Sequence, residues 1–577
     1  MRARGFAAVV VSLGLILVAT SCSARSLSTV ASVPAVSAAA GGTIYILRSG
    51  RVAAWDPQRL NIGADMAFAG RVFQRTLTAW APATGQGKLP PLSPDLATDA
   101  GKVSSDGLVW RFTLRKDAFW QDGKPVTCAD VKYGVSRTYA TTQITGGLAY
   151  ALDFLDVPQG ADGSSIYGGP YVKRGEAAFD HAVTCEGQTI SFRLARPVPD
   201  FGQVVALPAF APVRSDKDRG ALAATDIFSN GPYLLKGAWT AGKGGTFVRN
   251  PQWHARADPI RKGHPAELVY QEGVPVETAL SRIMTNHGPD QFAVTADSAP
   301  RVQQNDIMSN PSIKVRSSNP RGPFVDYLVP NFSRPTMTRL TVRQALAMST
   351  NREAYVRAVG GTAAAETTYA MINKSLPGYR DFNPIQVPPT GDAAKARTLL
   401  QASGLTMPVK ITVAYRKGLP GDIAMAALKQ GWDAAGFSVA LVGVPNDYFT
   451  NIAAVRNSSN YDVMWAVGSA QWPSGSSVIP SLFDSRLNLS ADSSGQDYGR
   501  FDNPAFNDRF DAADKIADVA RREQAWSDLD RDLQDTVAAI ALTNSKSLFV
   551  HGEGVANYVD NPALSGTVDL ATVSVGE

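Results

Sequence analysis

Histidine and cysteine are scarce in this sequence, and their scarcity argues against several classes of enzyme. The 577 residues include three cysteines and five histidines, which are scattered along the chain: His181, His254, His264, His287 and His551. No two histidines stand at the spacing of helical zinc ligands, and no H-E-x-x-H motif is present. The G-x-S-x-G turn of serine hydrolases and the P-loop of nucleotide sites are also missing. We therefore expect a protein that is not an enzyme and that holds no cofactor or metal.

Long apolar runs and basic runs are missing from the body of the chain as well. Beyond the first 20 residues, no segment approaches the length of a transmembrane helix. The 56 Lys and Arg nearly balance the 51 Asp and Glu. The sequence lacks a basic patch with interleaved aromatic residues, so nothing in it indicates nucleic-acid binding. With 44% hydrophobic and 19% charged residues, the composition is that of a globular protein. The length requires two or more domains.

The N-terminus has the pattern of an export signal. Arg2 and Arg4 precede an apolar stretch over residues 6–18, and small residues then lead to Cys22. The stretch is too short to span a bilayer and has the proportions of a secretory leader, which we predict over residues 1–21. A cysteine at this position resembles the lipobox of bacterial lipoproteins, in which the thiol is lipidated. The alternative is a plain signal peptide that contains a cysteine.

The segment after Cys22 has the composition of a flexible tether. Residues 22–40 contain one charged residue, Arg25, and no aromatic side chain. We therefore expect a globular body anchored by lipid to the outer face of the cytoplasmic membrane. Loss of the leader would leave 54 basic against 51 acidic residues, a net charge of +3.

The remaining two cysteines form an even pair. If Cys22 carries lipid, Cys128 and Cys185 are left over, and both follow a threonine. Outside the cytoplasm such a pair is expected to be bonded. The alternative is two buried, reduced thiols.

Strand-like and helix-like segments alternate through the body without a fixed period. This pattern predicts an α/β fold and argues against a repeat architecture. A strand near Phe112 leads to an Asp122-Gly123 turn and then to a helix that opens with a Thr127–Asp130 capping box. Farther on, "SNGPYLLKGAWTAGKGGTFVRNPQW" predicts a β-hairpin. "YDVMWAV" predicts an apolar strand, and one long helix is expected from about Asn503 to Val537.

The order of these segments resembles the family 5 extracellular solute-binding proteins of ABC importers, which include oligopeptide- and dipeptide-binding proteins. The resemblance covers essentially the whole body. It is carried by "LRKDAFWQDGKPVTCADV", "NGPYLLK", "FVRNPQW", "YLVPNFSRP", "VRQALAMSTNREAYV", "DAAKARTLLQASG", "YDVMWAVGSAQWP" and "FDNPAFNDRFDAA".

The resemblance implies a periplasmic-binding-protein-like α/β fold of type II, similar to cluster C. In such a fold two lobes close over a ligand by hinge motion, and an extra domain is inserted early in the chain. The segment order predicts lobe I at 41–62, 199–315 and 546–577, inserted domain II at 63–198, and lobe III at 316–545.

The resemblance also suggests where a ligand binds. In peptide-binding relatives the ligand lies extended between the lobes and pairs with protein backbone like an added strand. The segment after "YDVMWAV" supplies much of that edge, which implies backbone contacts at Gly468, Ser469 and Ala470; an ordinary tight turn is the alternative. Trp465 and Trp472 are candidate cleft walls, or else core residues.

One position departs from the family pattern. Peptide binders often carry an aspartate before the aromatic residue, where it pairs with the α-ammonium group of the ligand, but this chain has Gln471. Arg51, on the loop after the first strand, is a candidate cleft residue or a solvated surface residue. An amide in place of the carboxylate, with a guanidinium nearby, would favour a carboxylate or neutral ligand over a free amine.

The function implied is that of an extracytoplasmic lipoprotein, expected to be a monomer, that delivers peptides or peptide-like solutes to a permease. ATP would be hydrolysed by the partner complex. Opine, sugar and metal-chelate cargo remain open, as does a ligand-sensing receptor. A secreted hydrolase is disfavoured because neither a nucleophile–base pair nor a metal cluster is visible.

Overall fold

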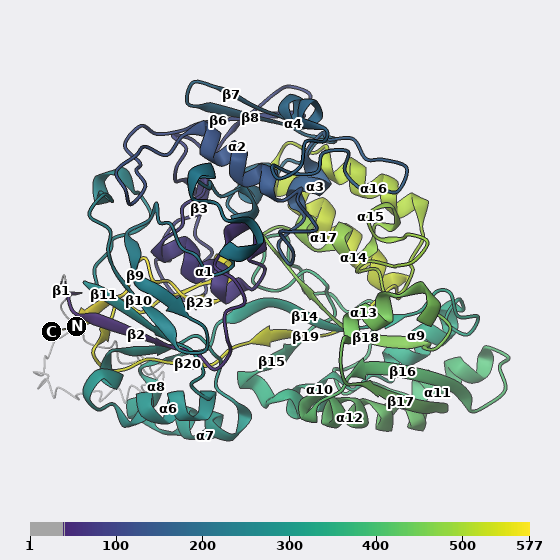
Figure 1. The fold of residues 1–577 in the computed structure, drawn as a ribbon. Helices are drawn as coiled ribbons and strands as arrows, with labels where there is room; N and C mark the ends of the chain where they lie inside the picture. The colour runs from purple at the N-terminus through teal and green to yellow at the C-terminus, as the bar shows by residue number, and fades with distance from the viewer. Residues whose placement is uncertain (1–37, 40, 577) are drawn as a thin grey trace, which may run out of the picture. The chain divides into compact units, whose positions relative to one another are not determined.

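The computed structural model describes residues 38–39 and 41–576. The predicted leader, Cys22 and nearly all of the tether lie outside the described residues, so what we expect of them remains prediction. Within the described part, no helix combines the length and the apolarity that crossing a membrane requires. Strands and helices are mixed along the chain (Figure 1), as their alternating sequence patterns predict.

Lobe I is built on a sheet with the strand order β12-β2-β11-β10-β9. β2 pairs in parallel with β11 and β12, while β9 and β10 form the antiparallel hairpin that the sequence predicts. Gly244 in this hairpin has a φ of +100°, and an added Cβ would lie 1.9 Å from the Tyr270 carbonyl oxygen, so only glycine fits there. The strands are β2 (Thr43–Leu47), β9 (Tyr233–Thr240), β10 (Gly244–Arg249), β11 (Glu267–Gln271) and β12 (Ala293–Thr295); the helices are α1 (Gly63–Val72), α6 (Val276–Thr285), α7 (Arg301–Ser309) and α8 (Pro311–Lys314).

The inserted domain carries an antiparallel sheet with the strand order β5-β6-β8-β7. The predicted strand–turn–helix is present: α2 begins with a reciprocal capping box, in which the Thr127 hydroxyl accepts from the Asp130 N–H and the Asp130 carboxylate accepts from the Thr127 N–H. The strands are β5 (Lys102–Val103), β6 (Val109–Thr113), β7 (Val183–Glu186) and β8 (Thr189–Arg193), with a separate β3 (Thr78–Trp80) and β4 (Leu92–Pro94) pair; the helices are α2 (Cys128–Arg137), α3 (Tyr150–Phe154), α4 (Glu176–Ala182) and α5 (Phe201–Val204).

The predicted disulfide joins the first residue of α2 to β7. Cys128 and Cys185 are bonded, with their Cα atoms 5.9 Å apart. The bond ties the capped helix to the sheet beneath it, which confirms the pairing expected from the even count.

Lobe III contains a mixed sheet with the strand order β15-β19-β14-β18-β16-β17. β18 is the strand predicted from "YDVMWAV", and it lies between β14 and β16. The strands are β14 (Arg321–Pro330), β15 (Ala365–Thr367), β16 (Val409–Arg416), β17 (Phe437–Val444), β18 (Val463–Ser469) and β19 (Ile540–Lys546). The helices are α9 (Leu340–Met348), α10 (Arg352–Val359), α11 (Ala393–Ala402), α12 (Leu419–Ala435), α13 (Tyr448–Ala453), α14 (Ile479–Phe483), α15 (Ser485–Asn488), α16 (Pro504–Asp514) and α17 (Val519–Asp535).

The long helix expected from Asn503 to Val537 is interrupted. Asn503 accepts from the Ala505 N–H as the cap of α16, which ends at Asp514. Asp518 then accepts from the Arg521 N–H and caps a new helix, α17. An aspartate that caps a helix takes a non-helical backbone conformation, so it breaks the run at this point.

Two short strand pairs and a small three-stranded sheet complete the body. The chain passes between lobe I and lobe III where β13 (Ser317–Ser318) pairs antiparallel with β20 (Phe549–Val550). In the three-stranded sheet, β24 (Ser574–Gly576) pairs with both β1 (Ala38–Ala39) and β21 (Val555–Ala556). The second strand pair is β22 (Asp560–Asn561) with β23 (Thr567–Val568).

The hydrophobic cores divide the chain slightly differently from the predicted domain ranges. Residues 63–73 fall in the range assigned to the inserted domain, but Phe68 and Val72 of α1 pack in the lobe I core with Ile44 and Phe247. Conversely, residues 201–210 of the range assigned to lobe I pack in the core of the inserted domain. At both places, neighbouring segments of the chain pack into different hydrophobic cores.

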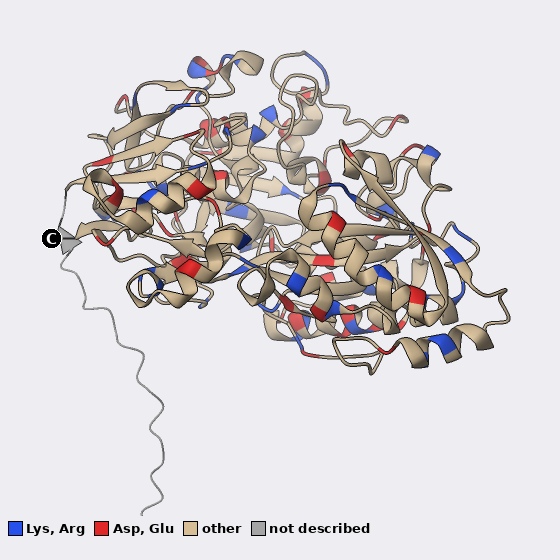
Figure 2. Cartoon of the chain, turned by 90° about the horizontal axis from the view of Figure 1, so that it is seen from below, with Lys and Arg blue, Asp and Glu red and all other residues tan. Residues whose placement is uncertain are grey.

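Charged residues of both signs are interspersed along the chain (Figure 2), in keeping with the 56 basic and 51 acidic residues. Several arginines are nevertheless buried, and two of these are paired with buried aspartates next to one cavity. Arg71 Nε lies 2.8 Å from Asp569 Oδ1, and Arg261 Nη2 lies 2.9 Å from Asp95 Oδ2. Both pairs border the cavity described next.

Candidate functional site

A cavity of about 260 Å³ lies where segments of all three parts of the body meet. Residues from 61 to 80 line it from α1 and β3, and residues 206–208 line it from the segment after α5. Lobe III contributes Ser469, the last residue of β18, and residues 470–473 after it, together with residues near 323 and 376. Residues 562–565, between β22 and β23, close another side.

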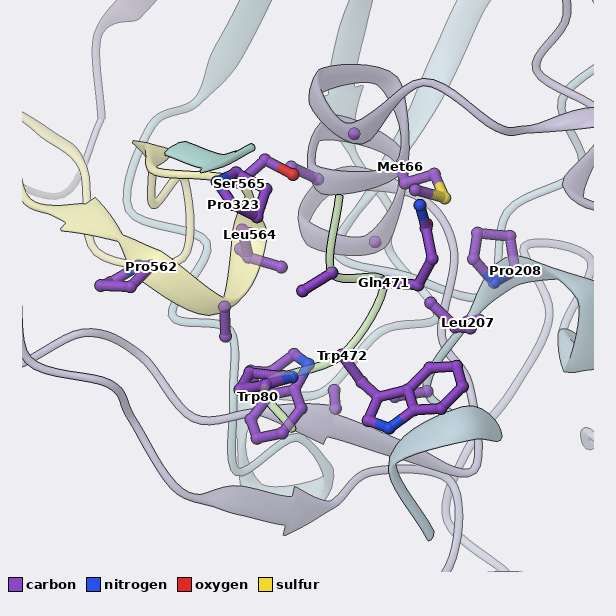
Figure 3. Close-up of a pocket in the computed structure, with 18 of the residues that line it drawn as sticks. Met66, Trp80, Leu207, Pro208, Pro323, Gln471, Trp472, Pro562, Leu564 and Ser565 are labelled. Atoms are coloured by element: carbon purple, nitrogen blue, oxygen red, sulfur yellow. The ribbon is translucent and has the colours of Figure 1, made fainter. Parts of the chain in front are cut away.

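The walls of the cavity are mostly apolar. In Figure 3 Trp80 and Trp472 border one side, while Met66 lies opposite and Leu207 and Leu564 lie to either side. Trp80 is the last residue of β3, and Met66 lies on α1. Two indoles and a flexible thioether provide a surface suited to apolar or aromatic groups of a solute.

Two glutamine amides are the polar groups of interest. Gln471 Nε2 donates to Ser469 Oγ at 3.1 Å, and Figure 3 shows the Gln471 side chain directed toward Met66. Gln74, just after α1, is 7% exposed and also lines the cavity. Within the described residues, the Gln74 side chain makes no hydrogen bond. Each amide can both donate and accept, so the pair suits a solute that carries amide groups.

Arg71 lines the cavity, but its positive charge is neutralised by a buried aspartate. Its Nε and Nη2 donate to the two carboxylate oxygens of Asp569 at 2.8 and 3.0 Å, and its Nη1 donates to the Trp80 carbonyl oxygen at 2.9 Å. Burial acts to raise the pKa of Asp569, but the Arg71 guanidinium and hydrogen bonds hold that pKa below its usual range. Asp569 therefore stays ionised and keeps Arg71 engaged.

Arg261 is balanced in the same way. Its Nη2 donates to Asp95 at 2.9 Å, its Nη1 contacts both Asp95 and Asp258, and its Nε donates to the Gly70 carbonyl oxygen at 2.7 Å. Arg75 joins the cluster through Asp95 at 2.8 Å. Two guanidinium groups and two carboxylates thus form a buried network of zero net charge beneath the cavity.

Four of the seven residues predicted to bind ligand line this cavity: Ser469, Ala470, Gln471 and Trp472. Trp472 is 4% exposed, and its ring packs edge-on against Tyr150 of the inserted domain with centroids 5.2 Å apart. The cleft-wall and core interpretations of Trp472 therefore both apply.

The structure does not bring the other three into the cavity. Arg51 is exposed, and its guanidinium lies beside Gly242 at the hairpin turn, the surface position that the sequence left open. The Trp465 indole donates to the Tyr355 hydroxyl at 2.9 Å and packs among core residues. Gly468 faces the core, where an added Cβ would lie 3.0 Å from Leu482 Cδ1.

The backbone of this segment is partly engaged already. β18 pairs with β14 up to Ser469, and the Ala470 N–H donates to the Pro323 carbonyl oxygen at 3.2 Å. The β14 side of the segment is therefore not open to a ligand strand. Side chains after β18, rather than this edge, face the cavity.

Polar contacts hold the two sides of the cavity together. Asp200, just before α5, is 4% exposed; it accepts from Arg522 of α17 at 2.9 Å and from the Ser476 hydroxyl at 2.7 Å. Arg196 also pairs with Asp514 at 3.1 Å. These contacts join the inserted domain to lobe III, next to Trp472.

The sequence did not point to the cavity residues Met66, Gln74, Trp80 or those at 562–565. They lie in segments that carry no recognisable binding motif. Only the arrangement of the elements brings these residues to one place.

Comparison with known proteins places this arrangement among transport binding proteins. Residues 91–488, more than half of the chain, match the family model described as "Bacterial extracellular solute-binding proteins, family 5 Middle". The peptide transport periplasmic protein SapA of Salmonella typhimurium is 24% identical over 95% of this chain and 95% of that protein. The periplasmic oligopeptide-binding protein OppA of Escherichia coli is 23% identical over 76% of each.

Solved structures show the same fold. The structure titled "Clavulanic acid biosynthesis oligopeptide binding protein 2" has a TM-score of 0.85 and 24% identity, and covers 94% of this chain and 97% of that one. The unliganded open form of the murein tripeptide-binding protein MppA has a TM-score of 0.70 and 20% identity, with 94% and 99% coverage. The predicted fold, of the type II periplasmic-binding class, is thereby confirmed.

Proposed function

Because the chain belongs to the bacterial extracellular solute-binding proteins of family 5, we propose that it captures peptides or peptide-like solutes between its lobes and delivers them to an ABC permease. The observation that carries the proposal is the position and lining of the cavity. Lobe III, lobe I and the inserted domain all contribute to it, and amide and indole side chains face it. Amides match the peptide group, and indoles match apolar side chains.

The proposed setting is the outer face of the cytoplasmic membrane. Lipid on Cys22 would anchor the body, the permease would receive the solute, and ATPase subunits of the importer would supply the energy. The chain itself would act as a monomer and as a binding protein without catalysis. The described residues that line the cavity include no His, Cys, Asp or Glu, so a peptide-like solute suits it better than a directly ligated metal.

The test is to identify the solute and to block its site. Native mass spectrometry of the protein purified from its host should show a bound peptide-like compound, and calorimetry with that compound should give its affinity. Ala563→Trp would place an indole in the cavity, whereas Ala221→Trp changes an exposed alanine and serves as the matched control. We expect the first variant to lose at least tenfold in affinity and the second to bind like the wild type.

Either of two results would refute the proposal. One is a bound solute that is not peptide-like, together with no binding of any peptide offered. The other is unchanged affinity in a folded Ala563→Trp variant, because this would place the solute elsewhere.

A further inference from the structure

We infer that the solute is uncharged at both ends: a small, apolar, amide-bearing compound such as a cyclic dipeptide or a linear dipeptide blocked at both termini. The inference rests on the proposed function and narrows its substrate class. The observations behind it are the anionic and the cationic groups around the cavity.

Among the described residues that line the cavity, no anionic group is available for an α-ammonium group. The lining contains neither aspartate nor glutamate, and Gln471, whose side chain projects into the cavity, is uncharged. Two buried carboxylates that contact lining residues, Asp569 and Asp95, accept hydrogen bonds from Arg71 and Arg261 and are neutralised by them. An ammonium group in the cavity would therefore lose its hydration without gaining a counter-charge.

Within the part of the chain that the structure describes, no cationic side chain of the lining is free to pair with a carboxylate either. Arg51, the guanidinium predicted to face the cleft, lies at the surface beside Gly242. Arg71 and Arg261 line the cavity but are only 3% and 1% exposed, and each donates to buried carboxylates and to main-chain carbonyl groups. Drawing Arg71 toward a ligand would leave the buried Asp569 without its counter-charge. Drawing Arg261 toward a ligand would leave two buried carboxylates, Asp95 and Asp258, with Arg75 alone. Both changes are strongly unfavourable.

The groups that do face the cavity match an uncharged amide. The Gln471 and Gln74 side chains both belong to the lining, and each carboxamide can donate and accept a hydrogen bond. The indoles of Trp80 and Trp472 border one side of the cavity and provide apolar surface. A solute with peptide groups and no terminal charge can satisfy these amides without bringing a charge into an enclosed space. The volume, about 260 Å³, lies just below the usual range for drug-sized ligands and fits a compound of dipeptide size.

Five compounds that share the same side chains test the inference by calorimetry. They are Leu-Phe, N-acetyl-Leu-Phe, Leu-Phe-amide, N-acetyl-Leu-Phe-amide and the cyclic Leu-Phe dipeptide. We expect the two uncharged compounds to bind most tightly, and each free terminus to weaken binding by about 10- to 100-fold, the range for one unpaired charged group. Comparing the affinity of the cyclic Leu-Phe dipeptide with that of N-acetyl-Leu-Phe-amide then shows which of the two uncharged forms the cavity prefers.

A charge placed in the cavity should reverse part of this order. Gln471→Glu adds a carboxylate of nearly the same shape, so Leu-Phe-amide should gain at least tenfold relative to N-acetyl-Leu-Phe-amide. Gln401→Glu makes the same change at an exposed position on α11 and should leave the order unchanged. Circular dichroism of both variants confirms that each is folded before the affinities are compared.

The outcomes separate the inference from the proposed function. If Leu-Phe binds as tightly as the uncharged compounds or more tightly, the solute is an ordinary peptide and the inference is wrong, while peptide binding stands. If none of the five binds and a different class of solute is blocked by Ala563→Trp, peptide binding itself is wrong.

Discussion

Replacing Asp200 by Asn should weaken ligand binding by weakening the contact across the cavity. Asp200 and Arg522 are 4% and 3% exposed at their side chains, with Oδ1 and Nη2 2.9 Å apart, and Ser476 donates to the second carboxylate oxygen at 2.7 Å. Asparagine keeps the shape and one acceptor but removes the charge. Arg522 would retain the carbonyl oxygen of Ile516 at 2.8 Å.

The magnitude follows from what is lost. A charge-assisted hydrogen bond contributes about 1.5–3 kcal/mol, and the remaining acceptor keeps the loss below that of an unpaired buried charge. We propose that this energy favours the arrangement in which the lobes enclose the solute, because the pair joins the inserted domain to lobe III next to the cavity residue Trp472. The dissociation constant of the solute should then rise by about 10- to 150-fold.

Calorimetry and small-angle scattering measure the two expected effects. Affinity should fall, and the unliganded variant should have a larger radius of gyration than the wild type. Asp528→Asn is the matched control, because Asp528 pairs with Arg380 at 3.2 Å but both side chains are well exposed, so its effect should stay near 1 kcal/mol or less. If Asp200→Asn changes neither affinity nor dimensions relative to this control, the pair does not hold the lobes together.

Three further predictions concern stability and location. Replacing Cys128 and Cys185 by Ala should destabilise the inserted domain by about 4 kcal/mol, because the bond closes a loop of 57 residues; the free energy of unfolding measures this, and two alkylatable thiols in the folded wild type would contradict the bond. Burial raises the pKa of Asp497 to about 7, so the native state holds a proton that the unfolded state releases, and this residue makes stability fall as pH rises from about 4 to about 7. Asp497→Asn should remove that component, and an unchanged slope of unfolding free energy against pH would contradict it. Cys22→Ser should release the protein from membranes with solute affinity unchanged, whereas sedimentation with membranes after a salt wash would disprove lipidation.

The fold could be predicted largely because its signals are local. A capping box at Thr127, turn glycines near residue 242 and an apolar strand near Met464 each specify an element through nearby residues, and all three are present. Errors arose where the outcome depends on distant packing. The sequence around Asp518 fits both one long helix and two helices, and the flanks of the inserted domain fit either core.

The candidate site was predicted only in part, for a related reason. Resemblance to a family transfers best to a contiguous segment, and residues 469–472 are such a segment. Arg51 was predicted near the cleft because it follows the first strand. The direction of a loop side chain depends on its neighbours, however, and the Arg51 guanidinium lies beside Gly242 in the β9–β10 turn. Gln74 and Trp80 carried no signal, since an amide and an indole occur as often in cores and on surfaces as in cavities.

Trp472 shows why assigning a residue to either core or cleft fails in a protein of this kind. The ring is buried among Tyr150 and Phe154 of the inserted domain, yet the same residue lines the cavity and follows β18 of lobe III. A side chain that lines a cavity between lobes can contact the solute with one face and the opposite lobe with the other. A solute that packs on Trp472 therefore also stabilises the position of the ring against the inserted domain, where Asp200 and Ser476 make their polar contact. Binding and lobe contact share one side chain, so a change in either should be felt by the other.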